Sequence, residues 1–171
     1  MGSIIAIDPG NIESGYVICQ HNGKDIMQII DFGKMENEEL KNQCIYAEEL
    51  FKVAGMEYSV AIEMIACYGM PVGKEVFQTC EWIGRFVEAL GPERVKRVYR
   101  KEEKSDLCHS QKANDSTIRQ ALIDRYAPGV RNYGKGTKKE PGFFYGFHAD
   151  VWSAMAVATT FFDKYIKGME I

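Results

Sequence analysis

Residues 3–8 read SIIAID and residues 58–63 read YSVAIE. Each stretch is an apolar run with the length of a buried strand, and each ends in a carboxylate, Asp8 or Glu63. A side chain at the carboxyl end of a buried parallel strand lies at the edge of the sheet where ligands bind. If the two strands are neighbours, Asp8 and Glu63 converge within a few ångströms. This pair is the starting point for predicting both the fold and the function.

The rest of the chain alternates between strand and helix patterns, which predicts an α/β fold. The expected strands cover residues 3–8, 14–20, 25–33, 58–63 and 95–99, and the expected helices cover residues 36–54, 73–90, 115–126 and 149–166. Residues 128–146 are rich in Gly, Lys and aromatic residues and are expected to form a long loop. This order indicates a five-stranded mixed sheet flanked by helices on both faces. No repeat or linker divides the chain, so we expect a single domain over residues 1–171.

The composition excludes several classes of protein. Of the 171 residues, 46% are hydrophobic and 26% are charged, as in an ordinary globular protein rather than a disordered one. The apolar runs are too short to span a bilayer, and the N-terminus has no basic region typical of a signal peptide. The five cysteines include no CxxC pair, which disfavours a disulfide framework or a zinc cluster. We therefore expect reduced thiols and a cytoplasmic protein with no membrane partner.

The net charge of −3 alone argues against a nucleic-acid partner, but the charge is unevenly distributed. Residues 94–139 contain 13 Lys and Arg against 5 Asp and Glu, whereas the rest of the chain contains 8 against 19. Such a run of charge is often a solvated helix face. This excess of positive charge is also large enough to supply a phosphate-binding surface. The loop around residues 133–139 combines glycine with lysine, which suits contacts with the phosphate backbone of a nucleic acid.

The carboxylates predict a metal site. Two close carboxylates repel each other unless a proton or a cation lies between them, and oxygen ligands select Mg²⁺ or Mn²⁺. A third acid, Asp150, lies in the stretch HADVWSAMAVA at the start of the last expected helix. Three carboxylates around two ions about 3.5–4 Å apart form a phosphodiester-cleaving site. Taken singly, Asp8 also suits a turn before Pro9, and Asp150 also suits the first turn of a helix.

Three motifs together resemble a known family. The stretches IAIDPGNIESGYVI, VAIEMI and HADVWSAMAVA, in this order, resemble the RuvC family of Holliday-junction resolvases in the ribonuclease H-like superfamily. The stretches IEMIACYGMPVGKEVFQTCEWIGRF, KANDSTIRQALIDRY and GTKKEPGFFYGFHADVWSA look particularly like the RuvC-like proteins of bacteriophages and prophages. The resemblance runs through most of the chain.

The resemblance implies a ribonuclease H-like fold and a Mg²⁺-dependent endonuclease, with two ions per site and Mn²⁺ as a substitute. Such an enzyme is a homodimer that resolves four-way branched DNA by paired symmetric nicks, here in the cytoplasm of a bacterium or a phage-infected bacterium. The metal-binding acids of the family fall on Asp8, Glu63 and Asp150. The family has a second acid on the last helix, where this chain has Ser153, which is a departure from the pattern. His148 is a candidate auxiliary ligand or proton-transfer group, and a structural role for it is also open.

The resemblance also implies DNA-contacting residues. The family's junction-wedging aromatic has no match at Ala66, and Tyr68 is the candidate that replaces it. The candidate phosphate contacts in the basic segment are Lys104, Lys112, Lys138 and Lys139. A candidate dimer face on the second expected helix comprises Phe77, Cys80, Ile83, Gly84 and Val87, although the same residues also suit ordinary core packing.

Two other functions stay open at this point. A non-catalytic protein that binds branched DNA on the same fold would explain Ser153. A nucleotide-binding protein of the ASKHA type would account for Asp8, Gly10 and Gly15 as a first phosphate loop. That class needs a second domain and a second glycine-rich loop, for which 171 residues leave little room.

Overall fold

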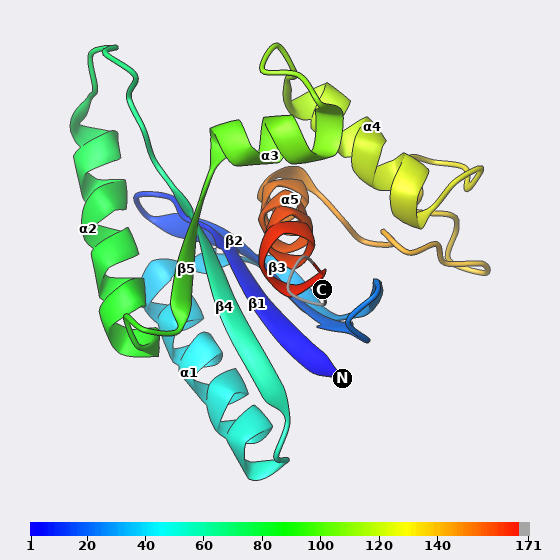
Figure 1. Cartoon of the computed structure of the whole chain (residues 1–171), viewed down its shortest axis with the longest axis horizontal. Helices are drawn as coiled ribbons and strands as arrows, with labels where there is room; N and C mark the ends of the chain where they lie inside the picture. Colours follow the sequence, from blue (N-terminus) through cyan, green and yellow to red (C-terminus); the bar gives the residue numbers. More distant parts are fainter. Residues whose placement is uncertain (168–171) are drawn as a thin grey trace.

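Five strands form one mixed sheet in the order β3-β2-β1-β4-β5, as Figure 1 shows for the computed structural model, which describes residues 1–167. The strands are β1 (Gly2–Asp8), β2 (Glu13–His21), β3 (Ile26–Glu36), β4 (Glu57–Met64) and β5 (Val95–Tyr99). The first three form an antiparallel meander, whereas β4 is parallel to β1 and β5 is parallel to β4. The predicted five-stranded mixed sheet is confirmed.

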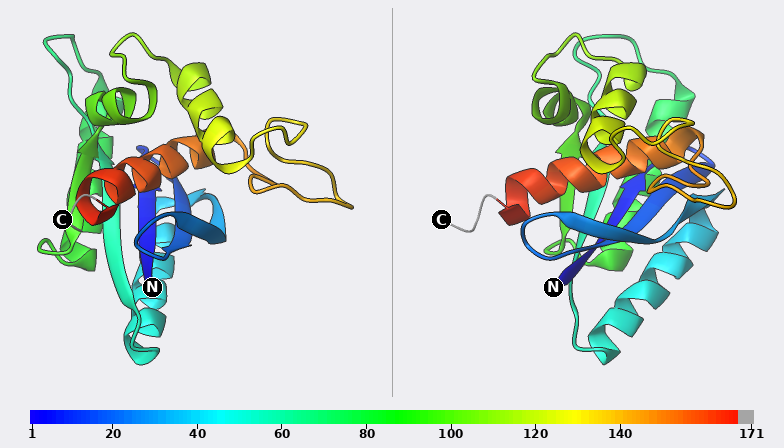
Figure 2. Two further views of the ribbon diagram at one scale, coloured as in Figure 1. Left: turned by 45° about the vertical axis from the view of Figure 1, so that its right-hand side comes forward. Right: turned by 90° about the vertical axis from the view of Figure 1, so that its right-hand side faces the viewer.

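Helices cover both faces of the sheet (Figures 1 and 2). One face packs against α1 (Asn37–Val53) and α2 (Lys74–Leu90), and the other packs against α4 (Asp115–Tyr126) and α5 (Ala149–Phe161). Strand β1 is buried on both faces because its side chains alternate between two cores. Ile5 and Ile7 join the core below α1 and α2, while Ile4 and Ala6 join the core below α5.

The last helix, α5, is apolar on nearly all sides and lies across strands β1 and β2. Small residues in its sequence ADVWSAMAVATTF allow its backbone to approach the sheet closely. The helix expected over residues 149–166 does reach its predicted end, but the last turn, η1 (Phe162–Ile166), is π-helical. No helix within residues 1–167 combines the length and the apolar character that crossing a membrane requires.

The helix α3 (Arg100–Cys108) is absent from the sequence prediction. Its sequence RKEEKSDLC has apolar residues only at its end, so it shows no amphipathic period. The helix begins with a polar capping arrangement, in which the Tyr99 amide donates to Glu102 Oε2 at 2.8 Å. The residue that α3 buries most deeply is charged, Glu103. A pattern based on hydrophobic residues could not have found this helix.

The predicted loop over residues 128–146 is confirmed and projects from the body of the protein in Figure 2. A single β-bridge between Gly136 and Pro141 closes its outer turn. At its base, Phe144 and Phe147 are buried and contact Trp152 of α5, with ring centroids 4.7 and 5.2 Å away. The loop is therefore anchored by aromatic packing directly before α5.

The residues proposed for a dimer face on α2 divide between two environments. Ile83 and Val87 are buried in the core with α1, so for them the core-packing alternative is correct. Phe77 is 62% exposed, and the space beside Gly84 is open. Cys80 is partly buried, and Phe77 and Gly84 lie on an exposed side of α2.

Candidate active site

The register of the parallel strands places acidic residues side by side at one end of the sheet. Ile7 of β1 is paired with Ile62 of β4, so that Asp8 and Glu63 are the next residue on each strand. Met64 of β4 is paired with Tyr99 of β5, which is followed directly by Arg100. Three adjacent parallel strands thus end at the same edge, as expected for a ligand-binding edge of an α/β sheet.

Asp8 and Glu63 share a hydrogen bond between their carboxyl groups. Burial, together with the negative charge of Glu63, raises the pKa of Asp8 to about 9. Burial also raises the pKa of Glu63, although the nearby Arg100 and the hydrogen bond from Asp8 oppose this shift. Without a cation, the pair therefore holds a proton that two exposed carboxylates would release.

A third carboxylate near this pair, Glu103, comes from α3 and is a site residue that sequence reasoning missed. Its side chain is fully buried, and its Oε2 accepts a hydrogen bond from Arg100 Nη1 at 2.6 Å. Its Oε1 has no hydrogen-bond partner among the described residues. Burial and the charge of Glu63 raise the pKa of Glu103 to about 8. The one sequence signal for it was its place four residues after β5, at the edge where Asp8 and Glu63 lie.

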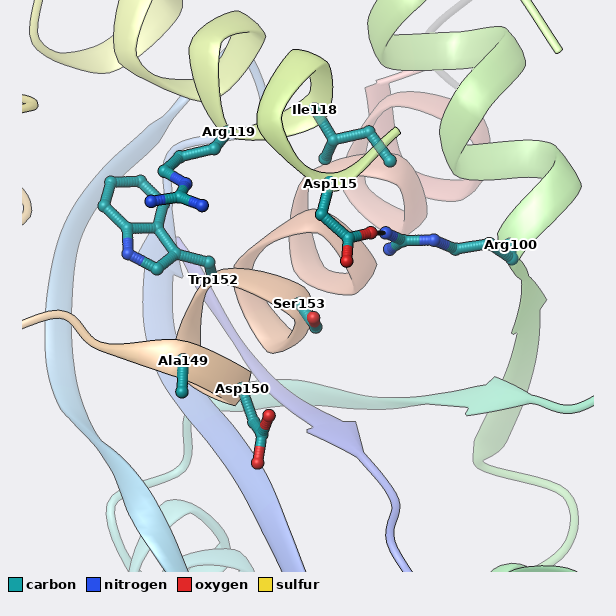
Figure 3. Close-up of a pocket in the computed structure, with 8 residues that line it drawn as sticks. All are labelled: Arg100, Asp115, Ile118, Arg119, Ala149, Asp150, Trp152 and Ser153. Carbon is teal, nitrogen blue, oxygen red and sulfur yellow. Dashed lines mark hydrogen bonds and ion pairs between the residues drawn. The ribbon is translucent and has the colours of Figure 1, made fainter. Parts of the chain in front are cut away.

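Asp150 lies in the first turn of α5 and forms an ion pair with Lys34 of β3, with Oδ2 and Nζ 2.8 Å apart. Its charge contributes to the raised pKa of Asp8, so Asp150 is electrostatically part of the site. Asp150 and Ser153 both line a pocket of about 220 Å³ beneath α4, drawn in Figure 3. In this view the Asp150 side chain points away from the Arg100–Asp115 ion pair, and Ser153 lies between them.

His148 is exposed and directly precedes α5, where its carbonyl accepts the Val151 amide at 3.0 Å. The backbone of His148 therefore caps the N-terminus of α5, which is a structural role. Its predicted role as a metal ligand or proton-transfer group stays a prediction.

The donor set at the end of the sheet consists of carboxylate oxygens, which suit Mg²⁺ or Mn²⁺. The partnerless oxygen of Glu103, buried near Asp8 and Glu63, is the local feature that a bound cation would satisfy. As placed within residues 1–167, no three His, Cys, Asp or Glu side chains are close enough together to hold one ion. The residues fit a divalent cation by the chemistry of their oxygen atoms, and binding would require the carboxylate side chains to move closer together.

The predicted DNA-contacting residues lie in three separate places. Tyr68 is 66% exposed in the loop after β4 and, with Lys104, lines a hollow of about 420 Å³ that also includes Arg100 of the site. Lys138 and Lys139 are exposed in the outer turn of the 128–146 loop. Lys112 is exposed between α3 and α4. The structure thus brings Tyr68 and Lys104 together beside the carboxylates.

Not every cation of the basic segment is free for a partner. Arg100 is paired with Glu103 and Asp115, and Arg125 is paired with Asp163. The number of positively charged side chains in residues 94–139 that can bind phosphate is therefore smaller than the charge count suggests. Lys112, Lys138 and Lys139 are exposed and form no ion pair with another of the described residues.

The strand order, the helices on both faces and the carboxylates at the ends of β1 and β4 define a ribonuclease H-like fold of the RuvC type. A RuvC structure from Thermus thermophilus is similar over 92% of this chain and 92% of its own, with a TM-score of 0.58 and 18% identity. The T. thermophilus RuvC solved in complex with a Holliday junction substrate is similar over 94% of this chain and 92% of its own, with a TM-score of 0.60 and 15% identity. No protein-family model and no curated protein sequence matches this chain. At these identities the likeness establishes the fold.

Proposed function

We propose that this protein is a metal-dependent endonuclease that resolves four-way DNA junctions by paired symmetric nicks. The observation that carries the proposal is the half-buried Asp8–Glu63 pair at the carboxyl ends of two parallel strands. Its support is the shared fold with RuvC, one structure of which contains a Holliday junction substrate. We further propose that the protein acts in the cytoplasm.

Asp8, Glu63 and Asp150 are the residues proposed to hold Mg²⁺, or Mn²⁺ in its place. Two bound ions supply an activated water and stabilisation of the leaving oxygen. The carboxylates position these ions, and burial reduces the screening of the ions' charge by bulk water. Arg100, placed beside Glu63 and Glu103, limits the negative charge that accumulates when no cation is bound.

The proposed DNA surface runs from Tyr68 and Lys104 beside the carboxylates to Lys112 and the loop lysines, Lys138 and Lys139. Exposed lysines bind phosphates without reading sequence, whereas an exposed aromatic side chain stacks on an unpaired base. Such a surface favours a branch point, where bases are unstacked, over a linear duplex.

Paired nicks require two active sites, so we propose a homodimer. Phe77 and the open surface beside Gly84 on α2 are the exposed remainder of the predicted dimer face. A glycine on an exposed helix face permits close approach of a second backbone, which is a common feature of helix contacts.

The decisive experiment measures cleavage of a synthetic four-way junction with Mg²⁺ by the wild type and by Asp8→Asn. We expect symmetric nicks from the wild type, no cleavage by the variant, and junction binding by both. A linear duplex of the same sequence serves as the substrate control. A fully active Asp8→Asn variant would contradict the site assignment.

A non-catalytic junction-binding protein is the second candidate, and one observation favours it. Ser153 stands where the RuvC family has an acid, and Asp150 is paired with Lys34 rather than with the other carboxylates. Junction binding by the wild type without cleavage in either Mg²⁺ or Mn²⁺ would support this function.

A further inference from the structure

Glu103 has an unusual environment for a carboxylate. Its side chain is completely buried, and only Oε2 has a partner, Arg100. A buried carboxylate oxygen without a hydrogen bond is unfavourable, and such atoms are rare in folded proteins. The position of Oε1 therefore calls for an explanation beyond packing.

An ion pair with Arg100 explains only half of this arrangement. The pair accounts for Oε2, but Arg100 also has a second partner, Asp115, and does not reach Oε1. Glu103 is on the helix that directly follows β5, and β5 pairs with β4 beside Glu63, so Glu103 comes from the same edge of the sheet and its charge acts on those of Glu63 and Asp8. A purely structural ion pair would be more stable farther from two other buried carboxylates.

Another acid on the same helix provides a comparison. Asp106 also has a buried oxygen, Oδ2, without a partner among the described residues. It lies near Asp163 and Arg125 and beside a different cavity, rather than near Asp8 and Glu63. The two acids thus share a helix and a type of environment but differ in which group they face.

We propose that Glu103 is a metal ligand of the Asp8–Glu63 centre and supplies, through Oε1, the carboxylate that Ser153 does not provide. This inference rests on the proposed function, because it concerns the metal of that same site. Arg100 holds Oε2 and thereby directs the other oxygen to the cation. The centre then draws its carboxylates from β1, β4 and α3, with Asp150 of α5 beside them.

The test is the binding of Mn²⁺ to the full chain in the absence of DNA, measured by calorimetry and by the shift in melting temperature. Glu103→Gln keeps the size of the side chain and removes its charge, and we expect its Mn²⁺ affinity to fall at least about tenfold. Asp106→Asn is the matched control and should bind Mn²⁺ as the wild type does. Asp8→Asn defines the site and should lose binding.

The outcomes separate this inference from the proposed function. If Glu103→Gln binds Mn²⁺ within a factor of two of the wild type, Glu103 is not a ligand, whereas the nuclease proposal stands. If Mn²⁺ binding depends on both Asp8 and Glu103 but no junction is cleaved, the ligand assignment stands and the nuclease proposal fails. A wild type without Asp8-dependent binding overturns both.

A crystal structure of the wild type grown with Mn²⁺ tests the same point without depending on the folding of a variant. An anomalous peak about 2.1 Å from a Glu103 carboxylate oxygen is the expected result. A peak bound by Asp8 and Glu63, with Glu103 still facing only Arg100, would overturn the assignment.

Discussion

Gly15 of β2 lies directly against Asp150 at the start of α5. A Cβ atom added to Gly15 would come within 2.6 Å of the Asp150 carbonyl oxygen and 2.8 Å of the Asp150 Cβ. Only glycine lets the helix approach the sheet this closely. Because Gly15 is paired with Asp8 across the β1–β2 ladder, the same contact brings Asp150 to the carboxylate edge of the sheet.

The Gly15→Ala variant should be less stable, because either α5 or β2 must shift to accept the methyl group. We expect a loss of about 1–3 kcal/mol in the free energy of unfolding, measured by urea denaturation. Equal stability of Gly15→Ala and the wild type would show that the contact is looser than described.

The metal-free protein should lose stability as the pH rises. The folded state binds protons at Asp8 and Glu103 up to pKa values of about 9 and 8, whereas the unfolded chain releases them near 3.8 and 4.5. Since the folded state binds more protons over this range, the free energy of unfolding falls with increasing pH. Calorimetric melting in a chelator at several pH values measures the slope. Asp8→Asn should flatten it, and an unchanged slope in that variant would contradict the role of Asp8.

The ion pair between Arg125 of α4 and Asp163 of η1 should depend on the shape of the guanidinium group. Arg125 donates two parallel hydrogen bonds to the Asp163 carboxylate, at 2.5 and 2.8 Å. Lysine keeps the charge but loses one of these bonds. We expect Arg125→Lys to reduce the free energy of unfolding by about 1 kcal/mol in urea denaturation. Arg131→Lys is the control, because its contact with Glu140 is longer, at 3.8 Å, and exposed.

Tyr68 and Lys104 should affect DNA binding differently. Tyr68→Ala should weaken binding to a four-way junction more than binding to a linear duplex, because stacking requires unpaired bases. Lys104→Ala should weaken binding to both and reduce the slope of log affinity against log salt by about 1. Junction affinities measured over a range of salt concentrations distinguish the two effects. Thermal stability should barely change in Tyr68→Ala, since its side chain is 66% exposed.

The fold was largely predictable because its strands and most of its helices bury apolar residues at regular spacing. The helix expected over residues 115–126 matches α4, and each of the five strands lies where its pattern indicates. The helix α3 escaped prediction because the side chain it buries is a glutamate rather than an apolar residue. A search for regularly spaced hydrophobic residues cannot identify a helix that buries a charged side chain.

The candidate site was predictable only in part. The adjacency of Asp8 and Glu63 follows from two parallel strands that end alike, and the structure shows it. The Lys34 contact of Asp150 and the burial of Glu103 depend on packing between elements far apart in the chain, for which single residues give no signal. In residues 94–139, Glu103 counted only as one of five acids within a basic segment. Of these five acids, Glu103 alone is fully buried.

The helix α5, which lies across the centre of the sheet, also bears on the order of assembly during synthesis. Asp8 and Glu63 leave the ribosome early, whereas α5 lies near the end of the described residues. Until α5 emerges, one face of the sheet lacks the helix that lies across its centre, and Asp150 has not joined the other carboxylates. A nascent chain that stops before Ala149 therefore exposes an apolar sheet face, a surface prone to aggregation and to capture by chaperones. The charged centre is complete only once α5 has been translated.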